Sequence, residues 1–133
     1  MPTQTTEKGA TETPDRRATL AKAMIRMFDE WQLSTADRLV LLGLAPDNRA
    51  ALARYSRGVP LSNSRDTLDR AGHLLAIYKN LKLLFPRNEN FRNGWMTASN
   101  TKFGGKRPVD VVADFGLTGL ALVRATLDRM RGS

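Results

Sequence analysis

The sequence contains no cysteine and only one histidine, His73. The lack of cysteine excludes disulfide bonds, thiolate zinc sites and cysteine nucleophiles, and it fits a reducing cytoplasm. A histidine-based metal cluster is excluded as well. No apolar run approaches the roughly 20 residues of a transmembrane helix, and the opening MPTQTTEKGATETPD has no apolar signal-peptide core. We therefore expect a cytoplasmic protein with no metal site and no membrane partner.

Sustained alternation of apolar and polar residues, the pattern of half-buried strands, is also missing. Apolar residues recur at helical spacing instead, so the sequence predicts an all-α fold. Polar caps, glycines and prolines mark the expected helix ends. The expected helices span about 15–31, 34–42, 46–58, 64–85, 108–115 and 117–131, with one or two helical turns inside 87–99.

The net charge is +8 and the pI is near 10.6, a balance that favours an acidic partner, most commonly nucleic acid. Residues 1–14 carry net −1 and are interpreted as a flexible polar tail. Residues 15–61 carry eight cations and five anions, and residues 62–133 carry twelve and six. The second half is thus the more basic one, which indicates more than a scaffold.

A helix-turn-helix candidate lies between Ser34 and Gly58, where two short helices flank a tight turn at LGLA. In such a motif the second helix enters the major groove and the first braces it. Arginine recognises guanine edges and asparagine recognises adenine, so the DNA-contacting candidates are Asn48, Arg49, Arg54, Ser56 and Arg57. Solvated arginines on an ordinary helical protein remain the alternative.

The stretch NTKFGGKRPVDVVADFG, residues 100–116, suggests a comparison with the phosphate loop G-x-x-x-x-G-K-[ST]. Aligning Gly105 and Lys106 with the final Gly-Lys puts Asn100 at the first glycine. It also puts Arg107 at the position of the magnesium-binding hydroxyl. No strand precedes the loop, so a nucleotide-binding loop is rejected.

A structural interpretation of the same loop explains it better. Gly104 and Gly105 can adopt positive φ, Phe103 can anchor the turn in the core, and Pro108 suits the start of a helix. Asn100 is expected to cap the loop by bonding nearby backbone amides.

Enzymatic readings are weak. His73 lies in the middle of a helix, beside its apolar stripe, and the carboxylates form no recognisable acid–base pair. We therefore assign no catalytic residue and no cofactor.

The order of the motifs resembles the Xre/MbcA/ParS family of antitoxins over about residues 33–132. The segments that carry the resemblance are LLGLAPDNRAALARYSRGVPLS, DRAGHLLAIYKNLKLLFP, NGWMTASNTKFGGKRPVDVV and LDRMRG. Most specific is a Trp…Asn…Phe-x-Gly-x-x-Pro signature at Trp95, Asn100, Phe103, Gly105 and Pro108. The position before the asparagine, often proline in the family, is Ser99 here.

This resemblance implies a type II antitoxin that catalyses nothing. Its C-terminal domain, residues 62–133, would block the active-site entrance of a RES-domain toxin that consumes NAD or transfers ADP-ribose. Its N-terminal domain, residues 15–61, would dimerise, bind the operator and repress the operon.

Candidate toxin contacts come from the signature, the cations of the loop and an expected exposed ridge on the last helix. They are Trp95, Asn100, Phe103, Gly105, Lys106, Arg107, Pro108, Arg124, Asp128 and Arg131. Trp95 and Phe103 are either interface hot spots or, the interpretation that we favour, core aromatics of a small domain.

Two other hypotheses stay open at this point. One is a stand-alone repressor whose C-terminal half only dimerises. The other, ranked far below, is a small enzyme or nucleotide-binding protein.

Overall fold

The computed structural model describes residues 12–132, and all regular structure within them is helical, as the sequence predicts. The helices are α1 (Pro14–Glu30), α2 (Thr35–Leu42), α3 (Arg49–Ser56), α4 (Arg65–Leu84), α5 (Glu89–Gly94) and α6 (Pro108–Met130). Two short 3-10 helices, Trp95–Thr97 and Thr101–Phe103, lie between α5 and α6. None of the described helices has the length and apolarity needed to cross a membrane. Residues 1–11 of the predicted tail lie outside the described residues.

Polar side chains cap the helices of the N-terminal half. Ser34 accepts a hydrogen bond from the backbone of Asp37, 3.1 Å away, and so begins α2 where the sequence predicts. The predicted start of α3 at Pro46 or Asp47 is wrong. That helix begins at Arg49, because the Asn48 side chain accepts from the Ala51 amide at 3.3 Å and acts as the cap.

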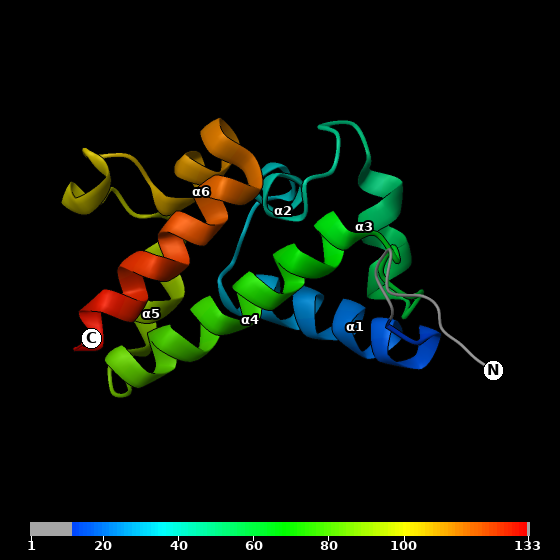
Figure 1. Ribbon diagram of the computed structural model, residues 1–133, viewed down its shortest axis with the longest axis horizontal. Coiled ribbons are helices and arrows are strands. Elements are labelled where there is room, and N and C mark those ends of the chain that lie inside the picture. Colours follow the sequence, from blue (N-terminus) through cyan, green and yellow to red (C-terminus); the bar gives the residue numbers. More distant parts are fainter. Residues whose placement is uncertain (1–11, 133) are drawn as a thin grey trace.

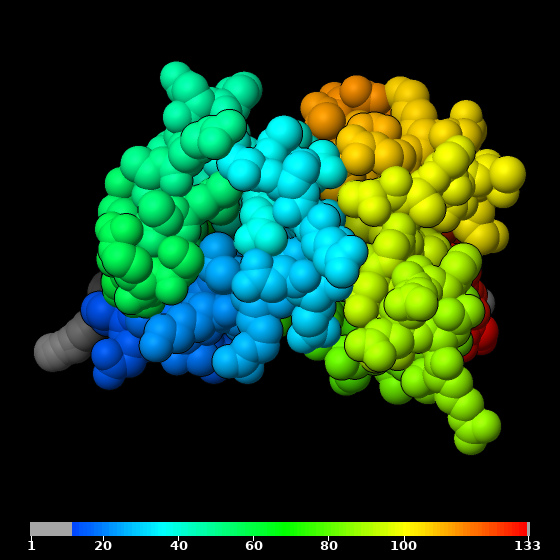
Figure 2. Space-filling model, turned by 180° about the vertical axis from the view of Figure 1, so that it is seen from behind, coloured from blue at the N-terminus to red at the C-terminus, as the bar shows by residue number. Residues whose placement is uncertain are grey.

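The helices form two lobes joined by α4 (Figure 1). We call α1–α3 the N-terminal lobe, and α5, α6 and the turns between them the C-terminal lobe. Helix α4 packs against both α1 and α6, and α2 packs against both α4 and α6. Figure 2 shows the α2 region, in cyan, where the N-terminal lobe meets the C-terminal lobe.

One hydrophobic core runs through both lobes. Its largest fully buried side chains come from α1, α2, α4, α6 and the connections between helices: Met24, Phe28, Leu39, Leu41, Leu61, Leu74, Ile77, Leu81, Met96, Val109, Leu120 and Leu127. Burial of each aliphatic side chain contributes about 1.5–3 kcal/mol to the free energy of folding. Since the two lobes share this core, each lobe stabilises the other.

A sharp bend divides α6 at Gly116, where φ is 61° and ψ is −137°. The sequence predicts two helices separated at this glycine, and the break is confirmed. The second arm folds back on the first at Gly119, where an added Cβ would lie 2.4 Å from the Val111 carbonyl oxygen. Only glycine permits so close an approach.

A buried arginine fastens α4 to α2. The guanidinium of Arg70 donates to the carbonyl oxygens of Val40 and Leu41, both at 3.3 Å, and its Nε bonds Asp66 at 2.8 Å. These carbonyls belong to the last turn of α2, where the helix dipole favours a cation. A Cβ at Gly43, which has φ of 68°, would lie 2.6 Å from the Arg70 Nε. No local signal in the sequence indicates this contact, because the two carbonyls lie 29 and 30 residues from Arg70.

Candidate functional site

The outer face of α3 presents unpaired cations. Arg49, Arg54 and Arg57 are exposed, and within residues 12–132 their side chains have no hydrogen bond or ion pair. The hydroxyl of Ser56 donates to the Ala53 carbonyl at 2.7 Å, so this side chain is partly engaged by its own helix. The face therefore has the positive charge and the free donors that bind phosphates and base edges.

The inner face of α3 holds the helix in place. Ala51, Leu52 and Tyr55 are buried, and the Tyr55 hydroxyl accepts from the Ser62 amide at 3.4 Å. The remaining candidate, Asn48, uses its side-chain oxygen for the helix cap and retains its amide nitrogen for an outside partner. Sequence reasoning thus identified the outward face of the helix but not the capping role.

Asn100 organises the loop before α6, as the sequence predicts. Its side-chain oxygen accepts from the Lys102 amide at 2.9 Å, and its backbone bonds the Lys106 carbonyl and the Gly105 amide at 3.1 and 2.9 Å. Ser99 adds a hydrogen bond from its hydroxyl to the Gly105 carbonyl at 2.6 Å. The serine that stands where the family often has proline therefore helps to close the loop.

The loop glycines are required by the backbone conformation and not by a lack of space. Gly104 and Gly105 have φ of 66° and 89°, and an added Cβ would meet nothing within 4 Å. Phe103 packs edge-on against Trp95 with ring centroids 6.3 Å apart, and Pro108 begins α6. Trp95 is only 5% exposed and Phe103 is half-buried, so both rings pack into the domain.

The two adjacent loop cations are paired within the chain. Arg107 spans from the loop to α2: it bonds Asp37 at 3.1 and 3.3 Å and Asp110 at 2.8 and 3.0 Å. Its hydrogen bonds lower the pKa of Asp110. Lys106 pairs with Asp114, whose hydrogen bond raises the pKa of the lysine. Sequence reasoning gave these cations no partner: it missed the nearby Asp110 and Asp114, and Asp37 lies 70 residues from Arg107.

Part of the predicted ridge on the last helix is bonded to α4. Asn80 is buried; it donates to Asp128 at 2.8 Å and accepts from Arg131 at 2.8 Å. Arg124 and Asp128 are half-buried rather than exposed, which corrects the expectation of a free ridge. Their contact with a toxin stays a prediction.

The single histidine also faces this helix. His73 Nδ1 lies 3.3 Å from a guanidinium nitrogen of Arg124. Partial burial, and then the charge of Arg124, lower the pKa of His73, while Asp69 opposes them. Among the described residues, no group of three or more acidic or histidine side chains is placed to hold a metal ion.

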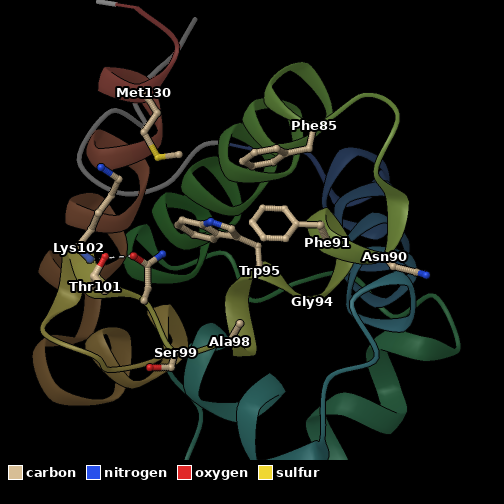
Figure 3. A pocket seen from close by; sticks show the side chains of 11 residues that line it. Phe85, Asn90, Phe91, Gly94, Trp95, Ala98, Ser99, Thr101, Lys102 and Met130 are labelled. Carbon is tan, nitrogen blue, oxygen red and sulfur yellow. Dashed lines mark hydrogen bonds between the residues drawn. The ribbon is translucent and has the colours of Figure 1, made fainter.

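An apolar groove of about 630 Å³ opens in the C-terminal lobe. Figure 3 shows the rings of Phe85, Phe91 and Trp95 and the thioether of Met130 around it. Phe91 is half-exposed and packs edge-on against Phe85, with centroids 4.8 Å apart. The lining residues are Phe85, Asn90, Phe91, Gly94, Trp95, Ala98, Ser99, Asn100, Thr101, Lys102 and Met130.

Of these lining residues, sequence reasoning proposed only Trp95 and Asn100 as candidate contacts. The spacing of Phe91 and Trp95, four residues apart, is a signal that could have indicated a shared aromatic face. Met130 could not be found in this way, since it reaches the groove from the far end of α6.

The fold and these surfaces define a helix-turn-helix protein with a second helical lobe that carries a structured glycine loop and a groove. Residues 10–76 match the antitoxin Xre-like helix-turn-helix domain. Residues 80–132 match the antitoxin Xre/MbcA/ParS C-terminal toxin-binding domain. The chain belongs to the Xre/MbcA/ParS antitoxin family and is a type II antitoxin with a toxin partner.

Two further proteins are similar to this chain. The uncharacterized protein y4oB of Sinorhizobium fredii (strain NBRC 101917 / NGR234) is 32% identical over 111 residues, which cover 84% of this chain and 83% of that protein. In the crystal structure of the M.tuberculosis MbcT-MbcA toxin-antitoxin complex, one chain is 21% identical with a TM-score of 0.49. That alignment covers 82% of this chain and 94% of the other.

Proposed function

We propose that this antitoxin neutralises a RES-domain toxin that consumes NAD or transfers ADP-ribose, by covering the toxin's active-site entrance. The match of residues 80–132 to a toxin-binding domain carries the proposal, and the Trp95-to-Pro108 signature is what points to the RES class. The site of action is the cytoplasm. Residues 62–133 are the toxin-binding part and residues 15–61 the DNA-binding part.

The N-terminal lobe binds the operator of the antitoxin's own operon and represses it. The three unpaired arginines on the outer face of α3 support this role, because unpaired cations on an exposed helix suit phosphates and guanine edges. The antitoxin acts as a homodimer, since a two-fold pair of such lobes matches half-sites one helical turn apart.

Co-expression tests the toxin activity. The protein encoded beside this chain, produced alone, should lower cellular NAD or modify a target with ADP-ribose and stop growth. Production of the antitoxin with it should restore both NAD and growth. A neighbour that is harmless on its own, or toxicity that this chain does not relieve, contradicts the proposal.

Operator binding together with complex formation separates the proposal from the alternative of a stand-alone repressor. Both predict that the purified protein retards DNA from its own promoter more strongly than unrelated DNA of equal length. Only the antitoxin proposal also predicts a stable complex with the neighbouring protein. If the same protein concentration retards promoter DNA and unrelated DNA, the binding is non-specific and the repressor role is contradicted.

A further inference from the structure

The groove in the C-terminal lobe has the features of a protein-docking site. Its apolar wall is formed by three aromatic rings and a thioether, and Phe91 remains 50% exposed beside it. An exposed aromatic at an apolar depression is typical of interface hot spots. The volume of about 630 Å³ lies in the range of clefts that enclose a ligand or a few side chains.

An unused hydrogen-bond donor lies in the groove wall. Trp95 lines the groove and is 5% exposed, yet within residues 12–132 its indole N–H has no hydrogen-bond partner. Among the described residues the only buried side-chain polar atom without a partner is Arg92 Nε, so the Trp95 indole N–H is accessible to solvent. It can therefore donate a hydrogen bond to a group that enters the groove.

The charge at one end of the groove indicates what that group is. Lys102 lines the groove, and it also lines an adjoining depression of about 340 Å³ together with Thr126, Arg129 and Met130. Among the described residues that line the two depressions, none is acidic. The Lys102 ammonium has no partner within the described chain, so this end attracts an anion.

We infer that the groove receives a toxin segment in which an apolar side chain is followed closely by a carboxylate. The apolar side chain packs against Phe91 and Trp95. The carboxylate accepts from the Trp95 indole and pairs with Lys102 at the cationic end. This inference rests on the proposed function, and it names the chemistry of the contact within it.

Matched substitutions test the groove against the purified toxin encoded beside this chain. Phe91→Ala removes an aromatic ring from the groove, and Phe115→Ala removes one of similar exposure outside it (62%). Lys102→Glu reverses a charge in the groove, and Lys79→Glu reverses an exposed charge on α4. Titration calorimetry measures toxin binding, and circular dichroism confirms that each variant is folded.

Each groove variant should weaken toxin binding by about tenfold or more, and each control should stay within about twofold. Because Lys102 and Lys79 are exposed and have no side-chain partner in the described chain, Lys102→Glu keeps the test informative even if Phe91→Ala unfolds. The loss of toxin affinity caused by Lys102→Glu should be smaller at high salt, because salt screens the charge interaction.

A second readout uses the two tryptophans of the chain. The antitoxin is labelled with 5-fluorotryptophan, and its ¹⁹F spectrum is recorded with and without unlabelled toxin. The Trp95 resonance should shift when toxin enters the groove. The Trp31 resonance, from a ring 2% exposed in the N-terminal lobe, should move less.

The remaining outcomes have distinct meanings. If the wild-type antitoxin does not bind the toxin, the proposed function fails. If it binds but Lys102→Glu binds equally well and the Trp95 resonance stays in place, only the groove assignment fails. If the groove variants alter self-association and leave toxin binding unchanged, a second copy of this chain occupies the groove, which overturns the inference.

Discussion

The two lobes use their cations differently. On α3 and at its C-cap, the side chains of Arg49, Arg54 and Arg57 have no partner within the described chain. In the C-terminal lobe most cationic side chains are bonded: Arg92, Lys106, Arg107, Arg124, Arg129 and Arg131. Net charge alone therefore does not locate a nucleic-acid surface. In the more basic half of the sequence, many of the cationic side chains are bonded to other groups of the same chain.

Removal of the most buried bonded cation should have the largest effect on stability. Arg70→Ala leaves two carbonyls of α2 and Asp66 without their donor, and it opens a cavity beside Gly43. We expect a loss of about 2–3 kcal/mol in the free energy of unfolding, mainly from the two carbonyls and the lost packing because Asp66 is exposed, measured by urea denaturation. Arg54→Ala, an unpaired cation on α3, should change it by less than about 0.5 kcal/mol. Similar losses of stability in the two variants would show that Arg70 is no more important to the fold than an unpaired arginine of α3.

Removal of the partly exposed tie between the loop and α2 should have a smaller effect. Arg107→Ala leaves the carboxylate of Asp37, 13% exposed, without its guanidinium. Solvent screening at Arg107 limits the expected loss to about 1–2 kcal/mol. Lys102→Ala serves as the control from the same loop and should have little effect. Arg107→Lys should restore only part of the stability, because lysine cannot bond both carboxylates in the same planar geometry.

The smallest expected effect is a dependence on pH. Arg107 holds the pKa of Asp110 below its usual value, so below about pH 4 the unfolded chain binds this proton before the folded chain does. The stabilisation is therefore present above that pH and is lost as pH falls through the lowered pKa. Because solvent screens this half-exposed carboxylate, we expect the stabilisation to be below about 1 kcal/mol in the free energy of unfolding.

The Asp110→Asn variant isolates this effect. The difference in unfolding free energy between wild type and variant should narrow from pH 7 towards pH 3. A difference that stays constant over this range would show that Arg107 does not perturb Asp110.

Local signals in the sequence predicted the helix ends well. Ser34, Gly43, Pro108 and Gly116 act through their own backbone or through amides a few residues away, so their roles can be read without knowledge of the fold. The predicted start of α3 was wrong for a local reason too. Asp47 and Asn48 are both good capping residues, and the structure shows that Asn48 is the cap.

Contacts between distant segments could not be predicted from one sequence. Arg70 meets carbonyls 29 and 30 residues away, and Arg107 meets a carboxylate 70 residues away. The groove likewise depends on the fold-back of α6, which brings Met130 to the wall that Trp95 forms. The sequence therefore indicated which residues carry the family signature, and tertiary packing decided which side chains remain available to a partner.

The central claim is that the unpaired cations of α3 bind operator DNA while the groove of the C-terminal lobe binds toxin. The most direct test measures both affinities for the same two variants, Arg54→Ala and Lys102→Glu. We predict that Arg54→Ala weakens operator binding by about tenfold or more and leaves toxin binding within about twofold. Lys102→Glu should do the reverse. Loss of both activities in either variant, or a loss of toxin binding in Arg54→Ala alone, would contradict the account.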